Sequence, residues 1–183
     1  MDRQRKPVRC ARTVVDLARG LDLFGRQAVG VLTDGAERGD RIERAATRVG
    51  DHTIFVNGAT LAGHVTVEDH AQIGAFCPVH QFCRIGKYAY IAAHTVITQD
   101  VPPFSKIVAP RGTRCYGVNS VGLERGGFSA ARVEAIEKAY RLLLRSKLNT
   151  TQALEKMRGT LSHSEDVLTL IRFVESAERG LTK

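Results

Sequence analysis

Residues 49–102 read VGDHTI FVNGAT LAGHVT VEDHAQ IGAFCP VHQFCR IGKYAY IAAHTV ITQDVP, which divides without a gap into nine hexads. The first residue of every hexad is large and apolar, and the fifth is always small or of modest size. The first positions are Val49, Phe55, Leu61, Val67, Ile73, Val79, Ile85, Ile91 and Ile97. The fifth positions are Thr53, Ala59, Val65, Ala71, Cys77, Cys83, Ala89, Thr95 and Val101.

A strict period of six fits neither an α-helix nor the alternation of an ordinary strand. It is typical of a three-sided solenoid, in which each hexad supplies one short strand and three hexads complete a coil. The large first residue fills the interior, and the fifth residue also points inward, where little room remains. The pattern therefore predicts a left-handed parallel β-helix of three coils, in a mainly β protein with an α-helical appendage.

The flanking segments break this pattern. Upstream, the frame places Glu37 and Glu43 at the large apolar position, so the ladder starts near Val49 and residues 1–48 form a basic segment of undetermined structure. Residues 103–128 are rich in proline and glycine, which favours a linker or loop. Residues 129–183 show helical spacing of apolar residues, with N-cap candidates at Ser129 and Ser164 and a second helix start in the cluster Asn149-Thr150-Thr151, and so predict a three-helix domain.

Composition narrows the function classes. The net charge of +8 favours polyanionic partners, among them nucleotide phosphates, nucleic acid or an acidic carrier protein. None of the four cysteines forms a CxxC pair or a Cys/His group with zinc spacing, so no metal site is expected and the thiols are expected to be reduced. No apolar run is long enough to span a bilayer, and the N-terminus does not look like a secretory signal. A soluble, cytoplasmic protein is expected.

Five segments carry a family resemblance: ATLAGHVTV at 59–67, VHQFCRIG at 79–86, QDVPPF at 99–104, YGVNSVGLERGGFS at 116–129 and the helical tail through Gly180 and Leu181. In this order they resemble the C-terminal half of acyl-[acyl-carrier-protein]–UDP-N-acetylglucosamine O-acyltransferases. The resemblance implies transfer of a 3-hydroxyacyl group from acyl carrier protein to the 3-hydroxyl of UDP-N-acetylglucosamine, the first step of lipid A synthesis. It also implies a homotrimer with sites between neighbouring solenoids, and no cofactor besides the carrier thioester.

The resemblance assigns roles to residues of two motifs on the solenoid. The backbone N–H of Gly63 would stabilise the oxyanion that forms during acyl transfer. The imidazole of His64 would contact the sugar or the acyl group. His80 and Gln81 would bind the sugar nucleotide.

Further roles fall on positions outside these two motifs. Asn119 and Arg125 would lie near the nucleotide and its phosphates, where a guanidinium is a fixed cation. Ala93 matches the residue that limits the length of the acyl chain. The family's catalytic histidine lies nineteen residues before His64, a position that Ala45 occupies here, and alanine cannot accept a proton. The sequence therefore names no certain catalytic residue.

Three alternatives stay open at this point. The chain could be a non-catalytic relative that keeps the trimeric scaffold, which Ala45 favours. It could be a hexapeptide transferase that uses acetyl-coenzyme A, although the GVN and GLERGGF segments favour the first family. It could bind nucleic acid through its basic N-terminus, although the sequence contains no recognisable nucleic-acid-binding module.

His52 is the nearest alternative base, but it lies one coil below His70, so the two are expected to stack on the outside of the solenoid.

Overall fold

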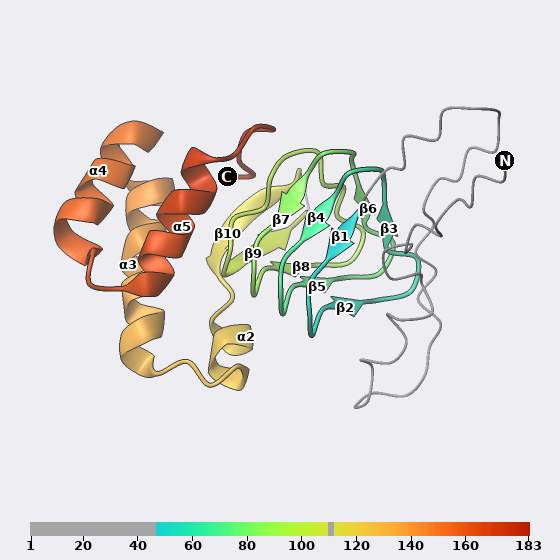
Figure 1. Cartoon of the computed structure of the whole chain (residues 1–183), viewed down its shortest axis with the longest axis horizontal. Coiled ribbons are helices and arrows are strands. Elements are labelled where there is room, and N and C mark those ends of the chain that lie inside the picture. Colours follow the sequence, from blue (N-terminus) through green and yellow to red (C-terminus); the bar gives the residue numbers. More distant parts are fainter. Residues whose placement is uncertain (1–46, 110–111) are drawn as a thin grey trace, which may run out of the picture.

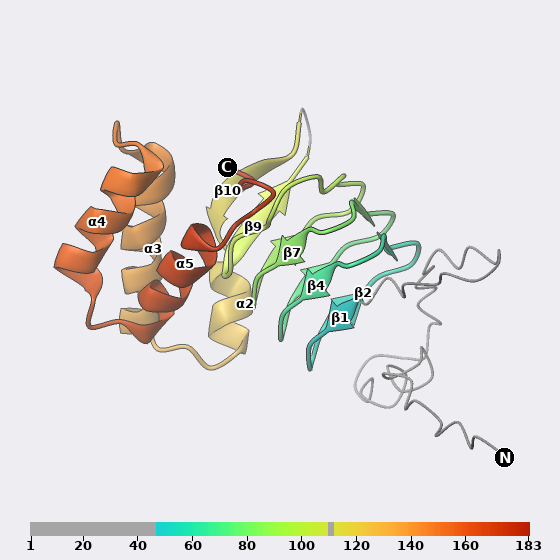
Figure 2. The ribbon, with the colours of Figure 1, turned by 45° about the horizontal axis from the view of Figure 1, so that its top comes forward.

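The computed structural model describes residues 47–109 and 112–183, and these form a β-solenoid followed by a helical domain (Figure 1). The helices lie at the end of the solenoid opposite to β1 and β2, as a second view also shows (Figure 2). Predictions for residues 1–46, among them the role of position 45, fall outside the described residues.

Three hexads make one coil of the solenoid, as predicted. Thr66 pairs in parallel with Arg84, and Val67 with Ile85, so residues 18 apart lie side by side. The strands are β1 (Arg48–Val49), β2 (Ile54–Phe55), β3 (Thr60–Leu61), β4 (Thr66–Val67), β5 (Gln72–Ile73), β6 (Pro78–Val79), β7 (Arg84–Ile85) and β8 (Tyr90–Ile91). Their pairing gives three faces, with β1-β4-β7 on one, β2-β5-β8 on the second and β3-β6 on the third.

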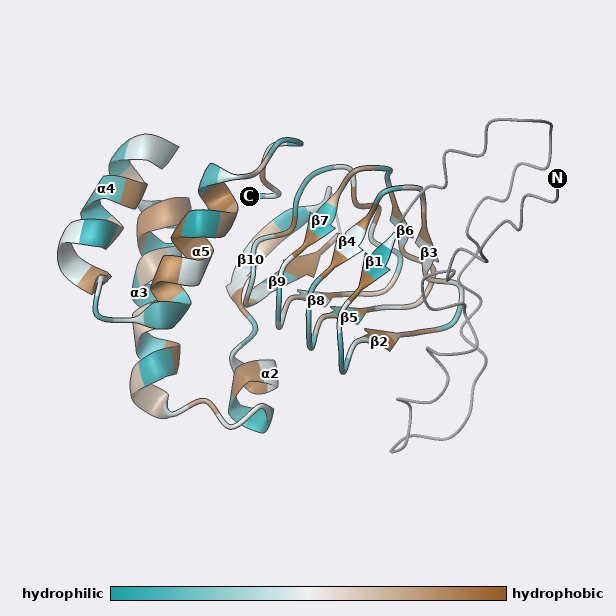
Figure 3. Cartoon of the chain, viewed as in Figure 1, coloured by the Kyte–Doolittle hydropathy of each residue, from teal (hydrophilic) through white to brown (hydrophobic). Residues whose placement is uncertain are grey.

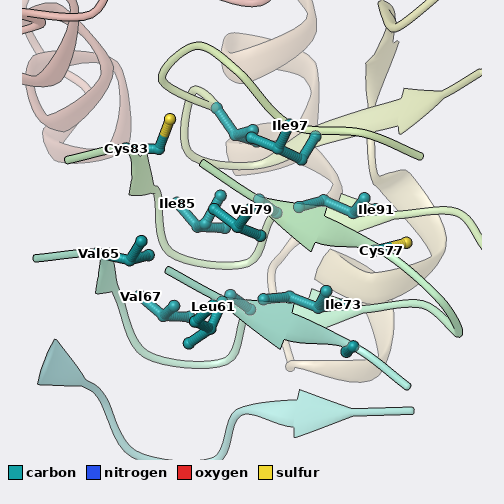
Figure 4. Packing of buried hydrophobic residues seen from close by; sticks show 14 of the residues in the cluster. Leu61, Val65, Val67, Ile73, Cys77, Val79, Cys83, Ile85, Ile91 and Ile97 are labelled. Carbon is teal, nitrogen blue, oxygen red and sulfur yellow. The ribbon is translucent and has the colours of Figure 1, made fainter. Parts of the chain in front are cut away.

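The interior of the solenoid contains the residues that the hexad pattern places there (Figure 4). From Phe55 to Ile97, every first-position residue is buried, and so is every fifth-position residue from Ala59 to Val101. Each apolar side chain removed from water contributes roughly 1.5–3 kcal/mol to stability. The small fifth residues leave room for the large first ones, so the prediction of an interior of alternating large and small residues is confirmed.

In the first eight hexads, the fourth residue lies at a corner of the prism, in the left-handed backbone region. The non-glycine residues among them, from His52 to His94, have φ values of 54° to 65°. This conformation costs an ordinary residue on the order of 1–2 kcal/mol. Corner rings one coil apart stack, with centroids 4.5–5.4 Å apart, which offsets part of the cost. The stacks define a His70 corner (His52, His70, Tyr88), a Phe76 corner (Phe76, His94) and a His64 corner (His64, Phe82).

Residues 103–128 are more ordered than a linker or loop. They contain β9 (Ser105–Val108), β10 (Arg114–Val118) and α2 (Ser120–Arg125). Strand β9 continues one face of the solenoid, because Ile107 pairs in parallel with Ile91 and is itself buried. Strand β10 then returns antiparallel to β9. Pro102 and Pro103 interrupt the hexad frame, so the sequence pattern did not reveal the additional strand.

The helical domain contains the three predicted helices, α3 (Ala130–Arg145), α4 (Thr150–Leu161) and α5 (Glu165–Glu175). Ser129, Asn149 and Ser164 cap them through side-chain oxygens, which confirms the N-caps predicted at Ser129 and Ser164 and the helix start predicted in the cluster that begins at Asn149. Apolar and polar residues alternate along these helices, as amphipathic helices require (Figure 3). Within the described ranges, no helix combines the length and apolar character needed to cross a membrane.

Hydrogen bonds tie the helical domain to the solenoid and its helices to one another. The hydroxyl of Tyr140, buried on α3, donates to the carbonyl of Pro103 at 2.6 Å and so joins the domain to the end of the solenoid. Arg132 donates two hydrogen bonds of 2.8 Å to the buried carboxylate of Asp166, which ties α3 to α5. The guanidinium of Arg132 also lies 3.8 Å from the ring centre of Phe128.

Candidate functional site

The turn at Gly63 and His64 forms the first part of the candidate site. His64 is exposed, and its ring stacks on that of Phe82 with centroids 4.9 Å apart and planes inclined by 9°. The carbonyl of Gly63 accepts the N–H of Phe82 at 3.1 Å. The imidazole is thus held in a fixed orientation at the surface by the coil that follows it.

The N–H at the third position of a hexad is a hydrogen-bond donor that faces outward. Two such groups bind carboxylate oxygens: Asp51 donates to Oδ1 of Asp69 at 2.8 Å, and Lys87 donates to Oε2 of Glu68 at 2.9 Å. Gly63 occupies the same position, and its N–H has no hydrogen-bond partner among residues 47–109 and 112–183. The turn therefore offers a donor of the kind that an oxyanion needs.

Beside His64 lies a surface groove of about 350 Å³ between the solenoid and the chain that follows α5. A smaller hollow of about 220 Å³ adjoins it and shares Arg84 and Ser176. The residues that line the groove are His64, Thr66, Phe82, Arg84, Asp100, Ser176 and Glu178.

Arg84 links the two walls of this groove. Its guanidinium donates to Oγ of Ser176 at 2.8 Å and lies 4.3 Å from the ring centre of Phe173, at the end of α5. It also forms an ion pair of 3.4 Å with Glu68 on the solenoid. Arg84 therefore fixes the position of α5 against β4 and β7.

Asp100 forms the floor of the groove and is almost fully buried. Burial raises the pKa of its carboxyl group, while hydrogen bonds from the backbones of Arg84 and Arg179 and the charges of these arginines oppose the rise. One of these hydrogen bonds, from the N–H of Arg84, measures 2.8 Å.

His80 and Gln81 are both exposed, on the coil that carries Phe82. Nδ1 of His80 lies 3.1 Å from the carbonyl oxygen of Gln81 and also 3.1 Å from Nη2 of Arg179, close to the C-terminus. The structure thus adds a contact for His80 that the motif around it did not reveal. The predicted binding of a sugar nucleotide by these two residues stays a prediction.

Asn119 is buried and occupied by structural hydrogen bonds. Its Oδ1 accepts the N–H of Gly122 at 3.2 Å, which caps α2, and its Nδ2 donates to the carbonyl of Tyr88 at 3.1 Å. These bonds hold α2 against the His70 corner. Arg125, the last residue of α2, is exposed there. Asn119 therefore positions the helix that carries Arg125, whatever further contacts it makes.

Ala93 is exposed next to His94, at the Phe76 corner. Its backbone packs closely on the coil below, because a Cβ at Gly74 would lie 2.6 Å from the nitrogen of Ala93. The predicted site residues thus lie on different corners, with His64 on one, Ala93 on another and Asn119 against the third. A single chain does not bring all of them together.

The remaining histidine prediction concerns His52 and His70. Their rings stack with centroids 4.9 Å apart and planes inclined by 11°, so the predicted stack is confirmed. The expected base position, Ala45, lies outside the described residues.

Sequence reasoning missed the groove residues contributed by the end of the chain. Ser176 and Glu178 line the groove, and Arg179 reaches His80, but these residues lie more than 90 positions from Arg84 and His80. No short motif joins them. The only available signal was the polar stretch that follows the apolar face of α5.

Two family models match the chain in succession. Residues 64–99 match the bacterial transferase hexapeptide model with six repeats, and residues 100–182 match domain 2 of UDP-N-acetylglucosamine O-acyltransferase. The curated acyl-[acyl-carrier-protein]–UDP-N-acetylglucosamine O-acyltransferase of Xylella fastidiosa is 42% identical over 135 residues, which is 74% of this chain and 51% of that protein. Over this region the chain is a member of the UDP-N-acetylglucosamine O-acyltransferase family.

Further members support the assignment. The enzyme of the same name from Halorhodospira halophila is 46% identical over 136 residues, covering 74% of this chain and 52% of that protein. The crystal structure of a UDP-N-acetylglucosamine acyltransferase from Bacteroides fragilis is 33% identical, with a TM-score of 0.72, and the match covers 75% of this chain and 53% of that one. The chain spans about half the length of the curated family members that it matches.

Proposed function

We propose that this chain takes part in acyl transfer from acyl carrier protein to the 3-hydroxyl of UDP-N-acetylglucosamine, in lipid A synthesis. The observation that carries the proposal is the turn at Gly63 and His64, which places an outward N–H and a fixed imidazole next to an open groove. The relatives that share this region are named for this substrate and for an acyl carrier protein.

In the proposed reaction, the sugar 3-hydroxyl attacks the carbonyl carbon of the thioester. A C–O bond forms, the C–S bond breaks, and the hydroxyl proton passes by way of a base to the departing thiolate. The tetrahedral intermediate carries a negative charge on the former carbonyl oxygen, which the N–H of Gly63 would stabilise. A single donor of this kind contributes about 10²–10³ to the rate in other acyl-transfer enzymes. The reaction needs no cofactor besides the carrier thioester and is set in the cytoplasm.

The general base is the group that this reaction needs and that the isolated chain is least able to supply. By the resemblance, the position of the family's catalytic histidine falls on Ala45, whose methyl group cannot take a proton. General acid–base catalysis is worth about 10²–10⁴ in rate. We therefore expect slow turnover by this chain alone. The second candidate function, a non-catalytic relative that binds the same ligands on the same scaffold, is favoured by this one position.

A homotrimer is part of the proposal. Ile54, Val56, Phe76 and Val96 are large apolar side chains that are each exposed by 42% to 59%, one or two on each of three successive coils. Exposed apolar side chains that gather on one side of a folded chain are typical of an interface between subunits. A neighbouring subunit there would also bring Ala93 near residues that its own chain keeps on other corners.

The test measures binding and turnover separately. Calorimetry with UDP-N-acetylglucosamine is expected to give saturable binding that His64→Ala weakens. Incubation with 3-hydroxyacyl carrier protein is expected to give little acylated product, and Ala45→His is expected to raise the yield. Acetyl-coenzyme A serves as the control donor. Absence of binding to the sugar nucleotide, or acetyl transfer from coenzyme A, would refute the proposal. Light scattering that gives the mass of a monomer would refute the trimer.

A further inference from the structure

The chain after α5 joins the solenoid at Asp100. The backbone N–H of Asp100 donates to the carbonyl of Gly180 at 2.9 Å, and the N–H of Thr182 donates to the carbonyl of Asp100 at 2.9 Å. Leu181 and Asp100 form a parallel β-bridge. This pairing fixes the backbone on the C-terminal side of Arg179.

Arg179 lies close to Asp100 and Cys83, since its charge opposes the rise in the pKa of both groups. Its Nε is buried, and within the part of the chain that the structure describes it has no hydrogen-bond partner. A side chain with a buried Nε, on a backbone fixed by the pairing next to it, presents its terminal nitrogen atoms within a restricted region.

That place is the imidazole of His80. Nη2 of Arg179 lies 3.1 Å from Nδ1 of His80, and the carbonyl oxygen of Gln81 lies 3.1 Å from the same nitrogen. A guanidinium has donors only, so its contact requires a lone pair on Nδ1. A carbonyl has acceptors only, so its contact requires a proton there. The two contacts exclude each other, and the charged donor makes the stronger hydrogen bond.

We infer that Arg179 is a positioning residue for His80: it holds Nδ1 as an acceptor and leaves the proton on Nε2, where it serves as a donor to an oxygen of the bound sugar nucleotide. The part of this inference that concerns the ligand rests on the proposed function. The part that concerns the tautomer rests on the geometry around Nδ1 alone. The series of neighbouring residues Asp100, Arg179 and His80 thus connects the floor of the groove to the residue that is proposed to bind the sugar nucleotide.

The tautomer is tested by long-range ¹H–¹⁵N NMR on protein labelled at histidine, with His80→Ala used to assign the signals. In the wild type, Nδ1 of His80 is expected to resonate as the unprotonated nitrogen. Arg179→Met removes the donor, leaves only the Gln81 carbonyl, and is expected to shift the proton to Nδ1. Arg179→Lys keeps a charged donor and is expected to restore the original form. A protonated Nδ1 in the wild-type tautomer, or no change in Arg179→Met, would overturn the inference.

Calorimetry with UDP-N-acetylglucosamine tests the consequence for binding. Arg179→Met is expected to weaken binding about fivefold, the equivalent of one hydrogen bond of about 1 kcal/mol. In a His80→Ala background the same change is expected to have no effect, because Arg179 acts through His80. Equal weakening in both backgrounds would contradict a positioning role. If wild-type protein binds no sugar nucleotide, the proposed function fails, and the NMR result still decides the tautomer.

Discussion

The junction between Gly86 and Pro103 allows a prediction whose magnitude follows from the structure. A Cβ at Gly86 would lie 2.4 Å from the nitrogen of Pro103, 2.6 Å from its Cα and 2.8 Å from its Cδ. Non-bonded carbon atoms attract one another at about 3.5–4.0 Å, so Gly86→Ala creates an overlap of about 1 Å. The obstacle is backbone and a rigid ring, so rotation of a side chain cannot relieve it.

The neighbours of Pro103 prevent it from moving away. Its carbonyl accepts a hydrogen bond from the hydroxyl of Tyr140 at 2.6 Å. The next residue, Phe104, is fully buried, and its N–H donates to the backbone carbonyl of Lys87 at 2.8 Å. Overpacking at such a site costs typically 1–3 kcal/mol, and we expect about 2–3 kcal/mol for Gly86→Ala. At this chain length, each kcal/mol lowers the melting temperature by about 2–4 °C.

Urea unfolding followed by circular dichroism measures the effect, and Gly159→Ala is the matched control. Gly159 is an exposed residue inside α4, and a Cβ there meets nothing within 4 Å. The same chemical change is therefore expected to stabilise the protein by about 0.5–1 kcal/mol. If Gly86→Ala is as stable as the wild type, or if both variants shift in the same direction, the argument from close packing at Pro103 is wrong.

Three further predictions concern the helical domain and strand β10 beside it. Tyr140→Phe leaves the buried carbonyl of Pro103 without its donor and is expected to cost about 1–3 kcal/mol in urea unfolding, whereas no loss would show that water replaces the hydroxyl. Asp166→Asn weakens the two hydrogen bonds from Arg132. Because half of the Arg132 side chain is exposed, the expected loss in the free energy of unfolding is about 1–2 kcal/mol, and a smaller loss is expected for Arg132→Lys. Burial raises the pKa of the Cys115 thiol from 9.0 to about 11, so alkylation by iodoacetamide at pH 8, followed by peptide mass spectrometry, is expected to be about a hundredfold slower than in the unfolded chain. Because the unfolded state loses this proton first, native stability is expected to fall between about pH 9 and 11, and a flat profile would contradict the burial of the thiol.

Much of the solenoid could be predicted because its pattern is local. Each hexad contains its own large and small interior residues, as at Ile85 and Ala89, and the same pattern recurs in every coil. The left-handed corners were not predicted, since histidine, phenylalanine and tyrosine are poor indicators of positive φ. The strand at Ser105–Val108 was missed because Pro102 and Pro103 shift the frame before it.

The candidate site divides in the same way. Gly63, His64 and His80 could be named because they lie in short motifs on consecutive coils. The partners of these residues could not, because Arg84 meets Ser176 and His80 meets Arg179 only after the chain has passed through four helices. Asn119 was named as a ligand residue. Its cap on α2 is a local contact with Gly122, whereas its second hydrogen bond, to the carbonyl of Tyr88, joins residues 31 positions apart that the sequence does not link.

The stacked corners have a consequence for how this sequence can vary. A residue such as His70 tolerates its left-handed backbone partly because rings above and below it, Tyr88 and His52, share its surface. Replacing one ring changes the energy of the residues one coil away, so the effects of substitutions along a corner are not additive. Substitutions at these positions should therefore accumulate as compensating pairs spaced 18 residues apart, so that the residues of one corner change together during evolution rather than independently.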